Sequence, residues 1–227
     1  MREKKIKIIN PDLKEDYHIH SSNYSDGENT VLEIIEQAGK MGLKKIAITD
    51  HAHKGRMPFE PRENILNFVN VINDVKVIFG LEGDILNKEG DITTEMAGVQ
   101  TDFLIISFHP PHYNDDFSTV TEGIVRAIER HHDKIFCLCH LHMGDVPWTT
   151  VPDFDAKKII ETANKFNLPL EINGAYIEGK YCNKEVLDLI WELSDTIVFN
   201  TDSHSLAHMT SRHEKLRKFL EEKGYLK

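Results

Sequence analysis

The amino-acid sequence predicts an α/β fold, a distorted (β/α)7 barrel of the TIM-barrel type, with a metal site at the C-terminal face of its strands. Short apolar strands alternate with amphipathic helices seven times in 227 residues, and this alternation favours a parallel sheet. His, Asp or Glu stands at the end of six of the seven strands. Those ends converge on one face in a barrel, whereas an open doubly wound sheet would spread them along an edge.

Seven short apolar runs indicate the strands. The first ends at His18-Ile19-His20, and the others cover residues 45–49, 75–81, 103–108, 135–139, 168–172 and 197–200. The run at 45–49 is almost continuously apolar, as expected of a strand that is buried on both faces. Residues 6–9 fit a further short strand. No linker or change of composition divides these elements, so we expect a single domain over residues 1–227.

Helices are predicted between the strands from apolar residues at helical spacing and from capping residues. Thr30 and Glu33 fit a capping box, and the apolar face of the helix they open would comprise Leu32, Ile35, Ala38 and Met41. The starts of the next helices are placed at Pro61, Ser118, Asp153 and Asn183. Residues 83–100 fit a loop with one short helix, and the last helix includes Leu216, Phe219 and Leu220.

The composition excludes several classes of protein. The formal net charge of −10 argues against a general nucleic-acid binder, which would present a basic face. The longest apolar run, residues 103–106, is too short to span a membrane, and no signal-peptide segment follows the charged N-terminus. Three cysteines, Cys137, Cys139 and Cys182, form no disulfide framework. We therefore expect a cytoplasmic protein with no membrane partner, and leave its oligomeric state open.

The first strand carries His18 and His20, whose side chains share one face because they are two residues apart. Such a pair makes a poor apolar surface and a good pair of metal ligands. The full convergent set comprises His18, His20, Asp26, His51, Glu82, His109, His140, Asp202 and His204. Six imidazoles and three carboxylates suit zinc, manganese or iron better than magnesium or calcium. Because one metal needs about four ligands, the set predicts two or three divalent transition metals that share a bridging carboxylate.

Several motifs together resemble the PHP (polymerase and histidinol phosphatase) family of metal-dependent phosphoesterases. They are His18-Ile19-His20 with Ser25-Asp26-Gly27, Thr49-Asp50-His51, Gly80-Leu81-Glu82, Ser107-Phe108-His109, Cys139-His140 and Asp202-Ser203-His204. The resemblance spans residues 16–204 and implies a distorted (β/α)7 barrel that holds up to three metals. Residues 171–173, Glu-Ile-Asn, resemble a segment of the histidinol-phosphatase branch.

The resemblance also implies how the ligands are divided. Metal one would take His18, His20, Glu82 and Asp202; metal two would share Glu82 and add His109 and His140; metal three would take Asp26, His51 and His204. Many members have His-Pro after the fifth strand, where this chain has His140-Leu141-His142. Either histidine could therefore be the ligand, and the strand register favours His140. The arginine that relatives often carry after Glu-Ile-Asn is absent, and the nearest basic residue is Lys180.

Other residues have two interpretations each. Asp50 would orient a ligand histidine or serve as a turn or cap residue. Arg56 and Lys180 would hold the phosphate or be surface charges, and His53, His112 and His142 would be proton donors or simple loop residues. Cys137 and Cys139 are interpreted as core residues. The solvated surface is the expected place of His131, His132, His208 and His213.

The expected activity is hydrolysis of a small phosphomonoester, with histidinol phosphate the leading candidate, by a metal-activated hydroxide. The catalytic group would be Glu82, Asp202, His204 and Asp50, and a local metal cluster would attract the anionic substrate. Three alternatives compete. They are an amidohydrolase-type barrel, which would want a modified lysine where His109 stands; a non-catalytic metal-binding or regulatory domain; and a DNA exonuclease, against which the lack of a basic patch argues.

Overall fold

A computed structural model describes residues 6–52, 71–72, 74–96 and 99–226. Its eight parallel strands are β1 (Lys7–Ile8), β2 (Glu15–Ile19), β3 (Lys45–His51), β5 (Val75–Asp84), β8 (Leu104–Ser107), β9 (Ile135–Leu138), β10 (Leu170–Asn173) and β11 (Thr196–Asn200). The helices are α1 (Val31–Lys40), α3 (Val120–His131), α4 (Ala156–Lys165), α5 (Lys184–Leu193) and α6 (Leu206–Glu222), with short 3-10 turns at Pro110–His112 and Phe117–Thr119. The helix expected from Pro61 lies outside the described residues.

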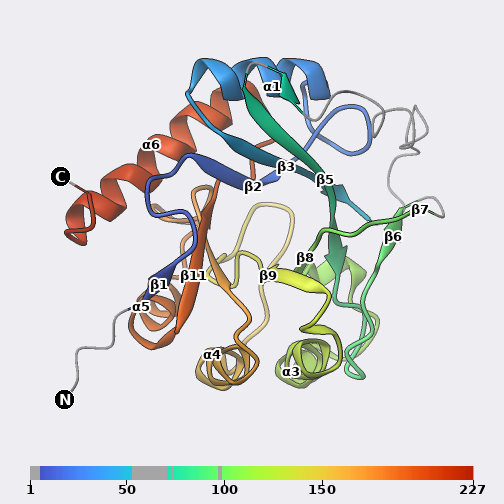
Figure 1. The fold of residues 1–227 in the computed structure, drawn as a ribbon. Coiled ribbons are helices and arrows are strands. Elements are labelled where there is room, and N and C mark those ends of the chain that lie inside the picture. The colour runs from blue at the N-terminus through green and yellow to red at the C-terminus, as the bar shows by residue number, and fades with distance from the viewer. Residues whose placement is uncertain (1–5, 53–70, 73, 97–98, 227) are drawn as a thin grey trace.

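The parallel strands follow one another in the order β1-β11-β10-β9-β8-β5-β3-β2. The sheet curls round so that β2 approaches β11 again (Figure 1). Seven of the strands form the barrel-like curl, and β1 adds an eighth beside β11. The α/β class and the TIM-like curl of parallel strands predicted from the sequence are confirmed.

Buried polar side chains close the seam between β2 and β11. Asn200 Oδ1 accepts a hydrogen bond from Tyr17 N at 2.9 Å, and Asp16 Oδ1 accepts one from Thr201 N at 3.2 Å. The Asn10 side chain donates to the carbonyl oxygens of Glu15 and Phe199, at 2.8 and 2.6 Å. At the C-terminal end of the seam the two backbones bond directly, since His20 N donates a hydrogen bond to Ser203 O at 2.9 Å. The first and last strands of the curl are therefore joined mainly through side chains.

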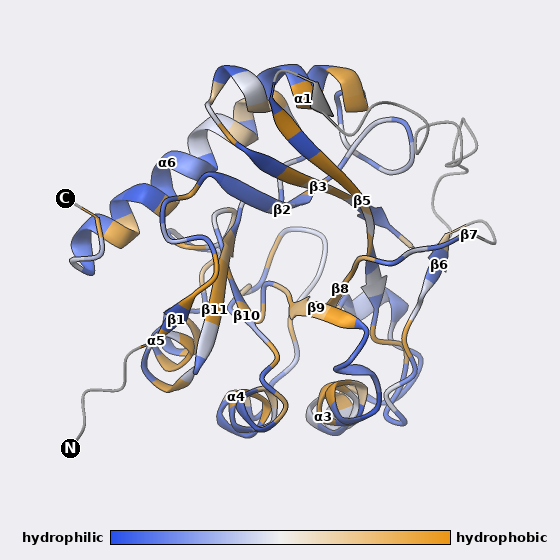
Figure 2. Ribbon diagram, in the orientation of Figure 1, coloured by the Kyte–Doolittle hydropathy of each residue, from blue (hydrophilic) through white to orange (hydrophobic). Residues whose placement is uncertain are grey.

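The helices cover the outside of the curl. Helices α3, α4 and α5 lie along one side, and α1 and α6 along the other (Figure 1). Their coiled ribbons alternate between hydrophilic and hydrophobic colours around the axis (Figure 2), as expected of helices that pack one face on a sheet. Among the described residues, no helix combines the length and the apolar composition needed to cross a bilayer.

Helix α1 has the predicted start but a different buried face. Thr30 accepts a hydrogen bond from Glu33 N, and the Glu33 carboxylate accepts one from Thr30 N at 2.8 Å, which completes the capping box. The buried residues are Val31, Ile34, Ile35 and Ala38. The prediction was wrong for Leu32, which is 53% exposed, because the burial stripe includes the first helical residue and excludes the second.

Cap positions were predicted unevenly. Asn183 caps α5 as expected, since its side chain accepts from Val186 N. Helix α4 is capped by Asp155 rather than Asp153. Asp116, rather than Ser118, caps the 3-10 turn that leads into α3.

Instead of the short helix expected within 83–100, the described residues there include the antiparallel strands β6 (Glu95–Met96) and β7 (Val99–Gln100). Strand β4 (Val71–Ile72), also antiparallel, pairs with β5.

One of the four histidines expected at the surface is buried. His213 on α6 has its Nε2 2.6 Å from the carbonyl oxygen of Leu13, and is 8% exposed. Its polar ring is tolerated there because that carbonyl accepts its proton. The prediction failed because a histidine in a polar segment gives no sign of a distant backbone partner.

A second apolar cluster fills the inside of the curl. Its buried members, which lie on or next to β2, β3, β8, β9 and β11, are Tyr17, Ala47, Ile105, Cys137, Cys139 and Val198. The Tyr17 ring lies 4.7 Å from that of Phe136, centroid to centroid. Both cysteines are core residues, as interpreted from the sequence. With its interior packed, the barrel can carry a ligand site only at its ends.

Candidate metal centre

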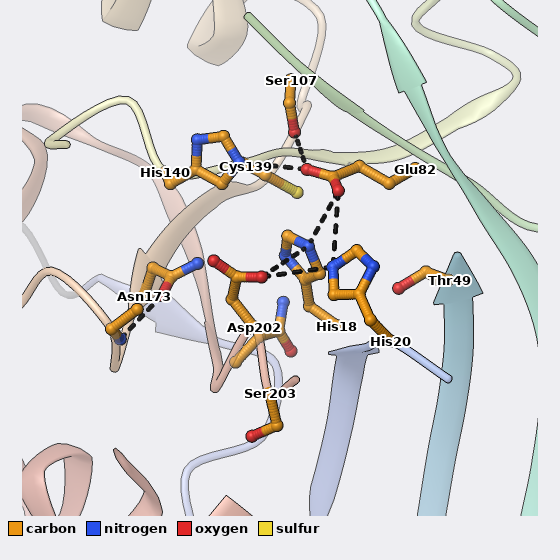
Figure 3. A network of polar contacts seen from close by, with 12 residues as sticks. His18, His20, Thr49, Glu82, Ser107, Cys139, His140, Asn173, Asp202 and Ser203 are labelled. Carbon is orange, nitrogen blue, oxygen red and sulfur yellow. Dashed lines mark hydrogen bonds and ion pairs between the residues drawn. The ribbon is translucent and has the colours of Figure 1, made fainter. Parts of the chain in front are cut away.

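All nine residues of the predicted constellation lie at the C-terminal ends of the strands or on the segments that follow them. Figure 3 shows His18, His20, His140 and Asp202 near the carboxylate of Glu82. His18 lies on β2 and His20 directly after it, His51 lies on β3 and Glu82 on β5. His109, His140 and the pair Asp202 and His204 follow β8, β9 and β11, and Asp26 lies on the loop after β2. These residues are contiguous in space because parallel strands all point the same way.

Glu82 is fully buried and faces imidazoles on several sides. Its Oε2 lies 2.8 Å from His51 Nδ1, 3.4 Å from His18 Nε2 and 3.5 Å from His20 Nε2. Its Oε1 lies 3.0 Å from His140 Nε2 and 3.5 Å from His109 Nε2, and accepts a hydrogen bond from the Ser107 hydroxyl. This carboxylate is therefore placed as a bridging ligand would be.

Four residues form what we call the inner group: His18, His20, Glu82 and Asp202. Asp202 Oδ1 is 3.5 Å from His18 Nε2 and 3.2 Å from His20 Nε2. Donor atoms around a tetrahedral metal, at bond lengths of about 2.0–2.1 Å, stand about 3.3–3.4 Å apart. His18 Nε2 is buried and has no hydrogen-bond partner among the described residues, although buried polar atoms nearly always find one. The spacing and this unsatisfied atom both fit a shared ion.

Three residues form the outer group: Asp26, His51 and His204. Asp26 Oδ1 lies 3.7 Å from His51 Nε2 and 3.4 Å from His204 Nε2. With His20, these residues can offer four ligand atoms to one ion. The Asp26 side chain is 49% exposed. Gly27 after it permits a close return of the loop, because a Cβ there would lie 2.4 Å from His20 O.

Glu171, in the middle of β10, holds the inner side of the centre. It is fully buried, and its Oε1 accepts a hydrogen bond from His18 Nδ1 at 2.9 Å. Its Oε2 accepts from His140 N at 2.9 Å, and Asn173 and Asn200 donate to it as well. Because a carboxylate only accepts, His18 carries a proton on Nδ1 and turns Nε2 toward Glu82. Sequence reasoning noted Glu171 only through the family resemblance.

Two aspartates give similar support. Asp84 Oδ1 accepts from His109 Nδ1 at 2.7 Å, which directs His109 Nε2 toward Glu82. This contact was not predicted, although Asp84 stands two residues after Glu82 on the same face of β5. Asp50 accepts from the backbone and hydroxyl of Ser21, at 2.6 and 2.8 Å. It thus holds the chain just after His20.

Burial and charge act against each other on these groups. Burial disfavours both charged forms, but the carboxylates of Glu82, Glu171 and Asp202 outweigh it and raise the pKa of His18. Burial likewise opposes ionisation of Glu82, but His18, His51 and His109 hold its pKa well below the usual range. For His51, the Glu82 carboxylate outweighs burial and raises the pKa to about 9. The site therefore pairs ionised carboxylates with imidazoles whose pKa values are raised.

Two residues of the centre have left-handed backbones. The φ angles are 29° at His140 and 52° at Asp202, a region that disfavours non-glycine residues. Glu171 holds the His140 amide. Arg212 Nη1 on α6 donates to the carbonyl oxygens of Thr201, at 3.3 Å, and of Asp202. Strained backbones supported in this way are typical of functional sites.

The remaining candidates lie elsewhere. Both ring nitrogens of His142 are occupied: Nε2 accepts from Asn173 N at 2.9 Å, and Nδ1 lies 3.2 Å from Tyr176 O. His140, rather than His142, therefore faces Glu82. Lys180 is exposed, with its ammonium 4.8 Å from the centroid of the Tyr181 ring, and it does not line the cavity described below. Arg56 and His53 lie outside the described residues.

The centre opens into a cavity of about 410 Å³. Its floor includes Asp26, His51, His109, His140, Asp202 and His204, and Arg212 and His208 border it. Among the described residues that line it, Arg212 is the only lysine or arginine. The cavity is large enough for a small metabolite.

Fold and centre together define a class of protein: an α/β barrel with a cluster of histidines and carboxylates, suited to several metals, at the carboxyl ends of its strands. The PHP-domain family model matches residues 16–180, and the chain belongs to this family.

Named relatives agree with this assignment. A probable phosphatase of Vibrio atlanticus is 29% identical over 174 residues, 74% of this chain and 66% of that protein. A probable phosphatase of Caldicellulosiruptor saccharolyticus is 28% identical over 223 residues, 92% of this chain and 87% of that protein. In structure, the histidinol phosphate phosphatase of Lactococcus lactis, solved with zinc, L-histidinol and phosphate, superposes with a TM-score of 0.62. The superposition covers 92% of this chain and 93% of that one at 17% identity, and it shows a shared fold.

Proposed function

We propose that the protein is a metal-dependent phosphatase that hydrolyses a small phosphomonoester at a centre of two or three divalent transition metals. The observation that carries this proposal is the convergence of histidine nitrogens and carboxylate oxygens around Glu82, at spacings that fit metal ligands. Such metals, when bound, polarise phosphoryl oxygens and lower the pKa of water.

The proposed ligand division uses the groups already described. The inner group would hold one ion, and Glu82 with His109 and His140 would hold a second. The outer group would hold the third, with His20 close enough to contribute. Zinc, manganese and iron all suit these ligands. Zinc is the metal in the Lactococcus lactis neighbour.

The chain's own residues have three further tasks in this proposal. Glu171 and Asp84 accept hydrogen bonds from Nδ1 of His18 and His109, which directs each Nε2 toward Glu82. Asp50 holds the turn after His20. Arg212 supplies a positive charge at the cavity wall, the position expected earlier for Lys180 or Arg56.

Histidinol phosphate is the candidate substrate that we would test first. The neighbour with the same fold was solved with L-histidinol and phosphate, and the cavity is of a size for such a molecule. The amidohydrolase alternative is disfavoured, because His109 stands where that class needs a modified lysine.

The test is a panel of phosphorylated metabolites, assayed with zinc-, manganese- and iron-loaded protein, together with elemental analysis of protein purified without chelators. We expect two or three metals per chain and phosphate release from at least one monoester. Less than one metal per chain after reconstitution would refute the metal centre. Faster release of nucleotides from single-stranded DNA than of phosphate from every monoester would refute the substrate class.

A further inference from the structure

The lining of the cavity includes two chemically different sets of side chains. One set is the ionisable residues of the centre. The other, which we call the apolar wall, comprises Pro110, Pro111, Met143, Trp148 and Tyr176. The two sets are in contact at Tyr176, whose ring lies 5.9 Å from the His140 ring, centroid to centroid. A phosphate held at the centre would therefore leave the apolar wall available to its leaving group.

Trp148 is the most unusual member of this wall. Its side chain is 73% exposed although it is large and apolar, and the only other tryptophan, Trp191, packs against Phe219 and Tyr225. A single exposed apolar residue on a surface needs no explanation. An exposed indole at the rim of a substrate-sized cavity is different, because a ligand in that cavity can cover it.

The segment that carries Trp148 is braced. Val146 and Thr149 exchange backbone hydrogen bonds of 3.0 and 3.1 Å, which makes Pro147 and Trp148 the tip of a tight turn. The Asp145 carboxylate accepts from Val151 N at 2.8 Å, and Gly144 N donates to Tyr181 O at 2.9 Å. The backbone beneath the indole is thus fixed at several points. Because the backbone is already fixed, little backbone freedom is lost when a ligand packs on the indole.

We propose that Trp148 is a specificity-determining residue that selects phosphomonoesters with a planar, aromatic or heteroaromatic leaving group. The indole face would pack on that group while the centre holds the phosphate, since aromatic pairs gain more than their buried area alone supplies. This inference rests on the proposed phosphatase function.

The test compares 2-phenylethyl phosphate with n-butyl phosphate. Both release a primary alcohol, and only the first carries an aromatic ring. We expect kcat/KM to favour the phenylethyl ester by about tenfold or more in the wild-type protein, the scale of one good aromatic contact. Trp148→Ala is expected to reduce this preference to about threefold or less with little change for the butyl ester, and Trp148→Phe to retain most of it. Leu32→Ala, which removes an exposed apolar side chain from α1, is the matched control.

Binding is measured separately by fluorescence. Trp191→Phe leaves Trp148 as the only tryptophan, and its emission should change on addition of the phenylethyl ester and not of the butyl ester. An unchanged preference in Trp148→Ala, or an equal loss for both esters, would overturn the inference while leaving the proposed function standing. If neither ester is hydrolysed by metal-loaded protein, the phosphatase proposal fails for these substrates. The fluorescence result then decides the role of Trp148 by itself.

Discussion

The inner and outer groups of the centre use similar side chains in opposite surroundings. The side chains of His18, His20 and Glu82 are 0% exposed, and that of Asp202 is 7% exposed. In the outer group the exposed fraction rises to 13% for His51, 24% for His204 and 49% for Asp26. The inner residues stand on or directly after strands, whereas Asp26 stands on a loop.

The difference in support is as large as the difference in exposure. Glu171 holds His18 and the backbone of His140 from a buried position. Asp26 is held mainly by contact with two histidines and by the neighbouring Ser25 hydroxyl, at 3.0 Å. Ligands on strands are held more precisely than ligands on loops. We therefore expect this centre to bind its metals with graded affinity, the outer one most weakly.

Substitution of Glu82 should break the centre most severely. Glu82→Gln keeps the shape but removes the charge that faces both sides of the site, and an amide bridges metals poorly. We expect a loss in kcat of about 10³-fold, equivalent to about 4 kcal/mol, with fewer metals per chain. His109→Ala is the comparison, assayed with excess metal. An equal or milder loss for Glu82→Gln would contradict the bridging role.

The framework behind the inner group should be sensitive to acid. Burial lowers the pKa of His142 to about 4, since its attraction to Glu171 is too weak to compensate. The folded pKa of His142 lies below its unfolded value of about 6.5, so folding favours the neutral imidazole. The free energy of unfolding therefore keeps its full value above about pH 6.5 and decreases as the pH falls toward about 4. The loss approaches about 3 kcal/mol.

Denaturant unfolding of metal-free protein between pH 4 and 7 measures this effect. His142→Gln should flatten the profile in this window, because it removes the titrating group. If wild type and variant lose stability in parallel, His142 is not responsible.

Substitution of Asp26 should affect the outer group and leave the metals of the inner group bound. We expect Asp26→Ala to keep the fold and about two metals, and to lower activity by about 100-fold through weaker positioning and charge stabilisation. Metal counting and kinetics beside His18→Ala provide the measurement. If the variant lost every metal, or kept three metals and full turnover, the assignment of Asp26 to a separate outer site would be wrong.

The smallest expected effect concerns Glu171. Glu171→Gln preserves the shape but loses the charge that orients His18, and residues that orient metal ligands typically contribute 10–100-fold in affinity. A competitive chelator titration should show this weakening at the tightest site. Glu178→Gln, an exposed change elsewhere in the chain, should leave the titration unchanged. A shift confined to the weakest site would reverse the order of the two groups.

The sequence was sufficient to predict the positions of the nine residues, because strand ends have a fixed direction in a parallel barrel. His18 and His20 could be paired from spacing alone, and Glu82 could be placed at the end of its strand. The partners of these residues were harder to find. Asp84 meets His109 and Glu171 meets His18 only because neighbouring strands bring them together, and sequence spacing carries no information about such a meeting.

Errors arose where a small shift changes the outcome. The exposure of Leu32 depends on a rotation of α1 by one residue, and Asp153 and Asp155 are equally good caps by type. Lys180 was suggested by its distance along the chain from Glu171, whereas Arg212 reaches the cavity from a helix much later in the sequence. Proximity in sequence is a weak guide to which charge lines a cavity.

The seam between β2 and β11 has a consequence for folding. The hydrogen bonds between Asp16 and Thr201 join positions 185 residues apart, and contacts of such long range form late because of the entropy of closing the intervening chain. His18 and His20 lie on one side of this seam and Asp202 on the other, so the inner group is assembled only when the barrel shuts. An ion bound there would stabilise the closed barrel. It would add about 4 kcal/mol to the free energy of unfolding when free metal is at 1,000 times its Kd. Without metal, amide hydrogen exchange should be faster along β2 and β11 than along the continuously paired β3 and β5.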